Sequence, residues 1–387
     1  MKQIIIKRKE NNENLILVLE NGILVEKHLE NTKNRNIEGN IFVGKVQNVL
    51  PGLDSAFVNI GKNRNAFIAV KDILPKKDIT KDKDESYTKT INKLVKPGDP
   101  IIVQVKKDTT TKKGVRVTTH LNIPGRFIVL CPNTPFVTVS QKITETVKLK
   151  QFVSENLPEN IGAIVRTNAK NATKEEIVLD IKNLLNKWKG ISEISIDNYP
   201  KQIYDSGGII KKLLIDVVDC GLEKIIVEDE KLKQEIDNIV KDLNKEVKII
   251  IDKEDILYNY NLDRQLKETE KRKIWLKSGG FITIDKTEAL TAIDVNSGKS
   301  IGKNNAEETI FDVNYEATIE ILKQLRIRDI GGIVIIDYID MKKEENKERI
   351  LNLLKEEIKK DRSKVQIEGF TRLNLMELTR KHLYNNS

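Results

Sequence analysis

Two aspartates each follow an apolar run in the last third of the sequence. Asp294 ends the run "ALTAI" and Asp337 ends the run "GGIVII". If these runs are neighbouring parallel strands, both carboxylates lie at the carboxyl edge of one sheet, where open α/β sheets bind their ligands. Adjacent carboxylates repel each other unless a cation joins them. Mg²⁺ is the expected ion, with Mn²⁺ as an alternative, because Mg²⁺ is held by one or two carboxylates, by water and by phosphate oxygens of the substrate.

Asn296 stands two residues after Asp294, where it would hold a carboxylate or a water molecule that attacks phosphorus. A single aspartate at a strand end is more often a turn residue or a helix cap. The pair of aspartates with Asn296 beside one of them makes a metal-dependent phosphodiester site an equally good interpretation. Asp340 follows Asp337 by three residues, so on a continuing strand it would face the other way, and we leave it out of the ion's ligands.

The segment "AIDVNSGKS" ends in Gly-Lys-Ser, as a nucleotide-binding P-loop does. A P-loop needs a second glycine five residues before Gly298, and that position is Ile293. The sequence therefore excludes a P-loop. Lys299, together with Arg372, would instead neutralise phosphate groups near the carboxylates.

Other kinds of catalytic site are poorly supported. The chain has three histidines and no nucleophile motif, which argues against Ser-His or Cys-His catalysis. Its two cysteines, Cys131 and Cys220, are far apart, which argues against a disulfide framework and against a zinc site within one chain. Paired carboxylates also hydrolyse sugars, but neither the fold pattern nor the basic balance of the chain favours that reaction.

The elements that would position the two aspartates are clear in the sequence. "GGFITID" and "ALTAID" are typical of strands, and an amphipathic helix is predicted over residues 306–328. "GGIVIIDYIDM" then forms a buried strand, followed by a helix over "EENKERILNLLKEEIKKD". Strand, long helix and strand imply a right-handed crossover, which makes the two aspartate-bearing strands parallel.

The rest of the chain is richer in strands. Residues 1–30 alternate short apolar runs, and Asn21-Gly22 is typical of a hairpin turn. Between residues 37 and 120, five strand-like runs separated by Gly, Pro and Asn predict a small barrel. Residues 122–200 mix helices and strands, with Thr173 and Glu176 forming a capping box where one helix begins.

Two aromatic residues in the barrel segment suggest contact with nucleic acid. Phe57 and Phe67 stand ten positions apart, close to basic loops. Rings on the surface of such a barrel stack on unpaired bases, and Lys107, Lys112 and Lys113 would follow the phosphate backbone. The alternative is that both rings fill the barrel core.

Composition sets only broad bounds. The 387 residues carry a net charge of +9, which is compatible with a polyanionic partner but also with a general abundance of lysine. The apolar run in the opening segment "MKQIIIKRKE" is too short for a signal peptide, and no apolar segment is long enough to span a membrane. We therefore expect a cytoplasmic protein.

These segments together resemble one family, the ribonuclease E/G endoribonucleases. "WLKSGGFITIDKTEALTAIDVNSGKS" and "QLRIRDIGGIVIIDYIDM" are similar to its catalytic signature. "GKVQNVLPGLDSAFVNIGKNRNAFI" resembles its RNA-binding barrel, and "GAIVRTNA" resembles its sensor for the 5′ end of RNA. The resemblance spans nearly the whole chain.

The resemblance implies a multidomain α/β fold. An RNase H-like subdomain, in two parts (1–36 and 206–272), would surround an inserted OB-fold RNA-binding barrel (37–120) and a 5′-sensor (121–205). A DNase I-like catalytic subdomain (273–387) would follow.

The resemblance also implies roles for particular residues. Asp294 and Asp337 match the family's magnesium ligands, and Asn296 matches a supporting asparagine. The remaining matches are the residues that grip the substrate, Phe57, Phe67, Lys113 and Arg372, and the pocket for a 5′-monophosphate, Gly125, Val129, Arg166 and Thr167.

Two departures from the family pattern lead to further expectations. Members usually continue into a Cys-Pro-x-Cys segment that shares zinc between subunits, and this sequence has no such segment. We therefore expect no zinc, and any homodimer would form without a zinc link. In the sensor, Ser140-Gln141-Lys142 stands where many members have a basic pair, which leaves the strength of 5′-monophosphate dependence open.

The implied function is a magnesium-dependent endoribonuclease. It would cut single-stranded, AU-rich RNA by hydrolysis, leaving 5′-phosphate and 3′-hydroxyl ends, in rRNA processing and mRNA decay. The alternative is a non-catalytic RNA-binding protein with the same fold.

Overall fold

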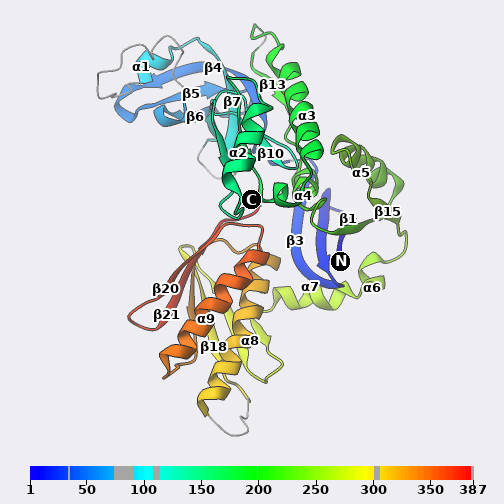
Figure 1. Ribbon diagram of the computed structural model, residues 1–387, viewed down its shortest axis with the longest axis vertical. Coiled ribbons are helices and arrows are strands. Elements are labelled where there is room, and N and C mark those ends of the chain that lie inside the picture. Colours follow the sequence, from blue (N-terminus) through cyan, green and yellow to red (C-terminus); the bar gives the residue numbers. More distant parts are fainter. Residues whose placement is uncertain (34, 74–90, 108–113, 198, 300–305, 385–387) are drawn as a thin grey trace. The chain divides into compact units, whose positions relative to one another are not determined.

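The computed structural model describes residues 1–33, 35–73, 91–107, 114–197, 199–299 and 306–384 (Figure 1). Contacts within the chain divide it into two compact units. Unit 1 comprises residues 1–30, 223–234 and 248–386, and unit 2 comprises residues 31–222 and 235–247. Each unit is described by itself.

The first sheet of unit 1 joins two distant parts of the sequence. Its strand order is β15-β14-β1-β2-β3. The predicted hairpin at Asn21-Gly22 is confirmed, because both residues have the positive φ angles (53° and 79°) that such a turn requires. The elements are β1 (Lys2–Lys9), β2 (Glu13–Glu20), β3 (Ile23–Asn31), β14 (Leu222–Val227), β15 (Lys248–Ile251), α6 (Ile256–Asn259) and α7 (Leu262–Glu270). The helix α5 (Glu230–Asp242) begins in unit 1 and continues into unit 2 from residue 235.

The second sheet of unit 1 contains the predicted crossover. Its order is β16-β17-β18-β19-β21-β20, and β18 and β19 are parallel, as predicted. The helix that joins them, α8 (Ala306–Ile327), lies where the sequence placed it. The other elements are β16 (Lys273–Trp275), β17 (Phe281–Lys286), β18 (Leu290–Asn296), β19 (Gly332–Asp337), α9 (Glu344–Glu357), a 3₁₀ turn (Ile358–Lys360), β20 (Val365–Phe370) and β21 (Leu375–Arg380).

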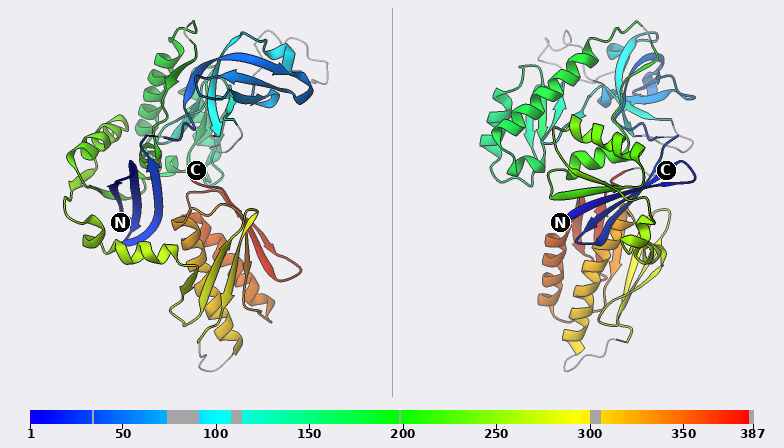
Figure 2. Two further views of the ribbon diagram at one scale, coloured as in Figure 1. Left: turned by 180° about the vertical axis from the view of Figure 1, so that it is seen from behind. Right: turned by 90° about the vertical axis from the view of Figure 1, so that its right-hand side faces the viewer.

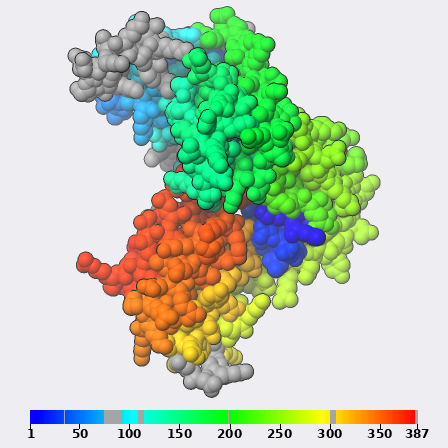
Figure 3. Space-filling view, in the orientation of Figure 1, coloured from blue at the N-terminus to red at the C-terminus, as the bar shows by residue number. Residues whose placement is uncertain are grey.

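Helices cover one face of this second sheet. Figure 2 shows α8 and α9 on the same side of the strands, and in Figure 3 their atoms face the viewer in yellow and orange. Ile293 and Ile336 of the strands are buried in one core with Ala317 of α8 and Leu354 of α9. Because side chains alternate along a strand, the residues between these core positions point to the opposite face. We call that opposite face the open face.

A buried arginine fixes the far end of β21. The Arg380 guanidinium donates to Asp361 at 2.8 Å, to Asp329 at 2.7 Å and to the Ile330 carbonyl at 2.9 Å. The arginine is only 2% exposed, and the two carboxylates are buried as well. These bonds tie β21 to the chain that enters β19, where Gly332 pairs with Arg380.

Unit 2 contains the barrel. Its strands follow the order β4-β5-β6-β8-β7, and β7 pairs with β4 to close the ring, so the five-stranded barrel is confirmed. β13 adds to β4 as a sixth strand. The elements are β4 (Ile41–Leu50), β5 (Ser55–Asn59), β6 (Ala66–Ala69), β7 (Pro100–Lys107), β8 (Arg116–Thr118), β13 (Lys201–Tyr204), α1 (Ile91–Leu94) and 3₁₀ turns at Pro51–Leu53 and Val70–Asp72.

A small sheet covered by helices completes unit 2. Its order is β11-β12-β10-β9. The predicted capping box is confirmed, since the Thr173 hydroxyl accepts from the Glu176 N–H at 3.2 Å and the Glu176 carboxylate accepts from the Thr173 N–H at 3.1 Å. The elements are β9 (Ile123–Pro124), β10 (Ile128–Cys131), β11 (Val137–Val139), β12 (Gly162–Val165), α2 (Thr146–Glu155), α3 (Lys174–Ser192), α4 (Ile209–Val217) and a 3₁₀ turn (Thr167–Asn171).

The chain is therefore a mixed α/β protein with several sheets and an OB-like barrel. The finer division into RNase H-like, 5′-sensor and DNase I-like parts, with the boundaries given above, stays a prediction. Within the described residues, none of the helices combines the length and the apolar character needed to span a bilayer.

We predict that Arg380→Met destabilises the protein strongly. The substitution leaves the carboxylates of Asp329 and Asp361 buried without their cation, which costs about 3–5 kcal/mol in comparable pairs. Arg264→Met is the matched control, because Arg264 pairs with Glu268 on an exposed helix surface and such pairs contribute less than about 1 kcal/mol. Urea unfolding measures both changes, and equal losses would show that the Arg380 network does not hold the sheet.

Candidate active site and RNA-contacting residues

The two predicted metal ligands lie side by side. In the parallel pairing of β18 with β19, Asp294 stands directly opposite Asp337. Both residues are exposed, whereas their neighbours Ile293 and Ile336 are buried. The carboxylates therefore project from adjacent strands on the open face, where solvent reaches them.

Asn296 holds one of these carboxylates. Its amide nitrogen donates to Asp294 Oδ2 at 2.5 Å. The two residues are two positions apart on β18, so strand alternation puts them on the same face. Holding a carboxylate was one of the two contributions predicted for Asn296, and the bond fixes the orientation of the Asp294 side chain.

The electrostatics of the pair reflect crowding of like charges. Burial raises the pKa of Asp337, and the negative charges of Asp294 and Asp340 raise it further. The strand-alternation argument for setting Asp340 aside does not apply, because β19 ends at Asp337 and the chain beyond it is irregular. A bound cation would relieve this repulsion.

The donor set fits a hydrated magnesium ion. Across the described ranges, no group of three or more His, Cys, Asp or Glu side chains is arranged to enclose a metal. The open face instead offers two carboxylates and leaves other positions around an ion to water and substrate oxygens. Mg²⁺ is bound in this way, and Mn²⁺ uses the same oxygen ligands.

The glycine of "NSGKS" has a packing role. A Cβ at Gly298, where φ is +55°, would lie 2.5 Å from the Gly279 carbonyl oxygen and 3.3 Å from Phe281 Cδ1. The next residue, Lys299, donates its N–H to that carbonyl at 3.1 Å. The turn after Asn296 is therefore pressed against β17, which explains a glycine here without any nucleotide.

Arg372 lies near the carboxylate edge of the sheet. It is exposed in the turn between β20 and β21, which Thr371 closes by donating its N–H to the Leu375 carbonyl at 2.8 Å. Leu375 pairs directly with Asp337. Arg372 makes no ion pair with any described residue, so its guanidinium is available to an anion.

Two aromatic residues of the barrel, Phe57 and Phe67, belong to a row on its surface. Phe57 pairs with Phe67, Phe67 with Arg116, and Arg116 with Lys107, across four adjacent strands. The two rings are 6.1 Å apart in an edge-to-face arrangement, and the Arg116 guanidinium lies 5.8 Å from the Phe67 ring. Both rings are half-buried, while their sequence neighbours Val58 and Ile68 fill the core.

The row places rings beside cations on the barrel surface. The alternative that Phe57 and Phe67 fill the core is therefore wrong. Such a row suits unpaired bases, which stack on rings, and the phosphates between them, which need positive charge. Lys112 and Lys113, the other predicted barrel contacts, lie outside the described residues.

Two of the predicted 5′-phosphate contacts are held by hydrogen bonds. The Arg166 guanidinium donates to the Gly125 carbonyl at 2.6 Å and is ion-paired with Asp216. The Thr167 hydroxyl is 2.9 Å from that of Ser140. A phosphate at Arg166 would therefore meet a guanidinium that a carboxylate already contacts.

Asp180 fixes the loop that carries Gly125 through hydrogen bonds to its backbone. This buried carboxylate accepts the N–H groups of Arg126, Phe127 and Ile128 at 2.8–3.2 Å. Burial raises the pKa of Asp180 although those three N–H groups favour its charged form. A Cβ at Gly125 would lie 2.7 Å from both oxygens of this carboxylate, so the loop requires glycine there. Val129, the fourth predicted contact, is half-buried on β10.

The comparisons with known proteins agree with this geometry. The sequence model of the "Ribonuclease E/G family" matches residues 122–383. "Ribonuclease G" of Salmonella typhimurium is 36% identical over 379 residues, which cover 95% of this chain and 78% of that protein. The chain belongs to the ribonuclease E/G family.

Other members support the assignment. "Ribonuclease G" of Haemophilus influenzae is 36% identical over 96% of this chain and 77% of its own length. "Putative ribonuclease E" of Buchnera aphidicola is 32% identical over 99% of this chain and 96% of its own length. The family resemblance seen in the sequence is thus confirmed, while the roles of individual site residues stay predictions.

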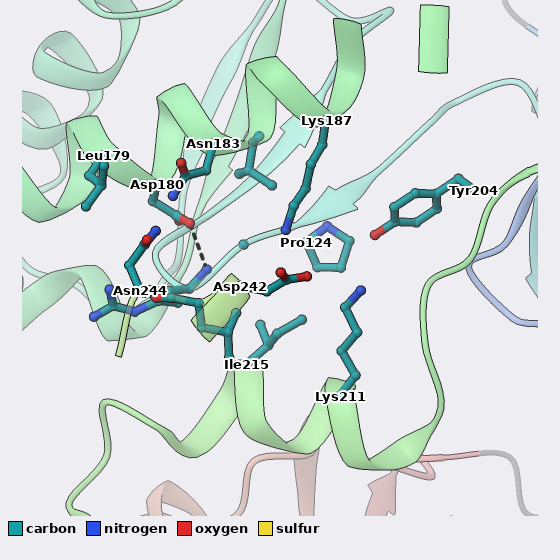
Figure 4. Close-up of a pocket in the computed structure, with 14 residues that line it drawn as sticks. Pro124, Leu179, Asp180, Asn183, Lys187, Tyr204, Lys211, Ile215, Asp242 and Asn244 are labelled. Atoms are coloured by element: carbon teal, nitrogen blue, oxygen red, sulfur yellow. Dashed lines mark hydrogen bonds between the residues drawn. The ribbon is translucent and has the colours of Figure 1, made fainter. Parts of the chain in front are cut away.

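A hollow lies beside the Gly125 loop and shares only Gly125 with the four predicted phosphate contacts. Figure 4 shows the side chains of Lys187, Lys211, Tyr204 and Asp242 converging on it. It encloses about 450 Å³, including solvent at its mouth, and Gly125 lines it but Arg166, Thr167 and Val129 do not.

The charges in this hollow influence one another. Burial lowers the pKa of Lys211, as does the nearby charge of Lys187. Burial and Asp205 raise the pKa of Tyr204 to about 12, so its hydroxyl stays protonated at neutral pH. The hollow thus combines lysine, tyrosine and aspartate side chains with apolar ones such as Leu184 and Ile215.

Several residues at these surfaces were missed from the sequence. Arg116, Asp216 and Asp180 carry no local motif, and each acts through a partner far away in the chain. Alternation around Phe67 and around Lys107 identifies outward positions, but only the pairing of β6 with β8 shows that Arg116 lies between them.

We predict that Gly125→Ala disturbs the loop around Gly125. The new methyl group would push against Asp180 and Leu184, and overpacking of this kind costs about 1–3 kcal/mol. Gly190→Ala on α3 is the control, because nothing lies within 4 Å of a Cβ there and alanine favours a helix by up to about 1 kcal/mol. Thermal unfolding of the two variants tests the argument; an unchanged midpoint for Gly125→Ala contradicts it.

Proposed function

We propose that this chain is an endoribonuclease that hydrolyses single-stranded RNA with Mg²⁺ as its ion. The observation that carries the proposal is the direct pairing of Asp294 with Asp337 on the open face, with Asn296 bonded to one of them. Two exposed carboxylates held next to each other repel, and a cation bound between them would remove that repulsion. Membership of the ribonuclease E/G family supports RNA as the substrate.

Asp294 and Asp337 would hold the ion. When bound, Mg²⁺ can activate water and stabilise the charge that develops on a phosphodiester. Asn296 keeps the Asp294 carboxylate in one orientation, so that its ligand oxygen is positioned before substrate arrives. Lys299 and Arg372 would neutralise the non-bridging phosphate oxygens. This attraction would strengthen as negative charge builds up on those oxygens during the reaction.

The reaction is hydrolysis. Water adds to phosphorus, and the bond from phosphorus to the 3′ oxygen breaks. The products are one fragment with a 3′-hydroxyl and one with a new 5′-phosphate.

The barrel would bind the strand that is cut. Bases stack on Phe57 and Phe67, while Arg116 and Lys107, with Lys113 beyond the described ranges, contact phosphates. Stacking recognises the face of a base, which paired bases do not expose, so this surface selects single strands. AU-rich RNA meets this requirement most easily because it pairs weakly.

The 5′-sensor would bind a terminal monophosphate. Arg166 and Thr167 would supply a guanidinium and a hydroxyl, and Gly125 and Val129 would line the place of the phosphate, while the N–H groups of residues 125–128 keep their partners within the protein. Because Asp216 already contacts the guanidinium, the phosphate must compete with a carboxylate. We therefore propose a modest preference for 5′-monophosphorylated RNA.

The setting we propose is rRNA processing and mRNA decay in the cytoplasm. A non-catalytic RNA-binding protein is the alternative, because the barrel row would bind RNA without the carboxylates. Cleavage distinguishes the two.

We predict that Asp294→Asn and Asp337→Asn each reduce cleavage at least a hundredfold. Loss of one carboxylate removes a metal ligand, and metal stabilisation of this charge amounts to several kcal/mol, with about 1.4 kcal/mol for each tenfold in rate. The assay uses a short single-stranded RNA with a 5′-monophosphate or a 5′-hydroxyl, with and without Mg²⁺. Asp312→Asn is the control, because it makes the same charge change at an exposed position of α8, on the other side of the sheet.

Three results are informative in that assay. Metal-dependent internal cuts that only the site variants lose support the proposal. Full activity in Asp294→Asn would show that the metal assignment is wrong. RNA binding without cuts under any condition would favour the non-catalytic alternative.

A separate prediction concerns metal binding without RNA. Mg²⁺ at ten times its dissociation constant should stabilise the wild type by about 1.4 kcal/mol and should not stabilise Asp337→Asn to the same extent. Without metal, Asp337→Asn should be at least as stable as the wild type, because it removes one of two repelling charges. Thermal unfolding across a Mg²⁺ titration measures both effects, and an identical metal response in the two proteins would place the ion elsewhere.

A further inference from the structure

A cluster of two aromatic rings and a lysine lies on the open face beside the carboxylates. Trp275 and Phe281 stand opposite each other in the pairing of β16 with β17, with ring centroids 5.3 Å apart. The Lys273 ammonium lies 4.2 Å from the Trp275 ring and 3.5 Å from the Phe281 ring. Trp275 is nevertheless 57% exposed, so much of a large flat ring is offered to solvent.

The strand register relates this cluster to the candidate active site. One row of paired residues runs Trp275, Phe281, Asn296. The neighbouring row runs Lys273, Thr283, Asp294, Asp337. Since adjacent strands lie about 4.8 Å apart, Phe281 is one strand from Asn296 and Trp275 is roughly 10 Å from it.

The cluster is held firmly in place. The turn between β16 and β17 donates its Lys277 and Ser278 N–H groups to the Glu316 carboxylate of α8, at 2.6 and 2.9 Å. On the other side, the turn after Asn296 packs so closely that a Cβ at Gly298 would come within 3.3 Å of the Phe281 ring. The rings are therefore fixed relative to the residue that orients Asp294.

We propose that Trp275 and Phe281 form a subsite that stacks on one base of the RNA, next to the phosphate held at the carboxylates. The inference rests on the proposed function and deepens it. Exposed aromatic rings beside a cation are the surface that unpaired bases and their phosphates bind. Trp275 supplies the stacking face, Phe281 supports it from the side, and Lys273 keeps the ring in position and neutralises a phosphate.

The chemistry of the face favours RNA over a protein partner. A protein seated on Trp275 would also cover Lys273 and the Asp294–Asp337 edge, and burying such charges without partners is unfavourable. An RNA strand leaves them solvated or pairs them with phosphate and cation. Trp275 and Phe281 are thus positioning residues for the strand, distinct from the carboxylates that contact the reacting phosphate.

The test removes the ring and the base separately. A set of 5′-monophosphorylated RNAs carries a single abasic site at successive positions around the cut. For the wild type, one abasic position should weaken substrate affinity by roughly tenfold to a hundredfold. Trp275→Ala should bind the intact RNA more weakly by a similar factor. Its affinity should no longer depend on whether a base is present at that one position. Trp275→Phe should restore most of the affinity and the sensitivity.

Two controls accompany these variants. Tyr258→Ala removes another exposed ring, 77% exposed on α6, and should leave affinity and the abasic profile unchanged. Thermal unfolding should show that Trp275→Ala folds like the wild type, since it alters an exposed side chain. Binding is measured in the Asp337→Asn background, so that it does not depend on turnover.

The outcomes separate the inference from the function on which it rests. If the wild type cleaves RNA but Trp275→Ala keeps the wild-type abasic profile, the stacking subsite is wrong and the proposed function stands. The subsite is also overturned if Trp275→Ala changes only the molecular mass of the protein in solution and leaves that profile intact. That result would assign the ring to an interface between copies of the chain. If the wild type neither cleaves nor binds any RNA, the proposed function fails and the inference fails with it.

Discussion

The parallel pairing of β18 with β19 forces two negative charges onto adjacent strands, and the chemistry of unit 1 depends on that register. Asp294 and Asp337 meet because both strands run in one direction and end at one edge. A shift of this pairing by one residue would turn one strand over and bury its carboxylate, because strand side chains alternate. The buried isoleucines Ile293 and Ile336 oppose that shift, since one of them would then be exposed. The hydrophobic core thus fixes the position of the charges.

One face of this sheet is left for function because both helices pack on the other. The crossover through α8 must cover one side, and α9 extends that cover. The strands β16 and β17 on one flank and β21 on the other then widen the open face around the carboxylates. The buried Arg380 network holds β21, and with it the turn that carries Arg372. Distant elements therefore determine which side chains surround a bound phosphate.

Features set by local sequence could be predicted, and features set by pairing between distant strands could not. The Asn21-Gly22 turn, the Thr173 capping box and the helix of the crossover follow from residues close together in the chain. The Asp294–Asp337 pair followed from strand ends and handedness. Trp275 and Arg116 were overlooked because their significance comes from which strand lies next to theirs. Asp340 was set aside on strand alternation, which stops applying where β19 ends.

Each unit carries its own surface of rings and cations, and this similarity has a consequence for selectivity. Phe57 and Phe67 lie beside Arg116 in unit 2, and Trp275 and Phe281 lie beside Lys273 in unit 1. Rings contact the faces of bases, which differ little among the four bases, whereas base identity is read at the edges. Asn296 follows Phe281 in one row and Asn48 pairs with Phe57 in the other, but among the described residues no side-chain amide or carboxylate lies between the two rings of either row. Selection by these surfaces should therefore depend on whether a strand is unpaired and how easily it unstacks, more than on its sequence.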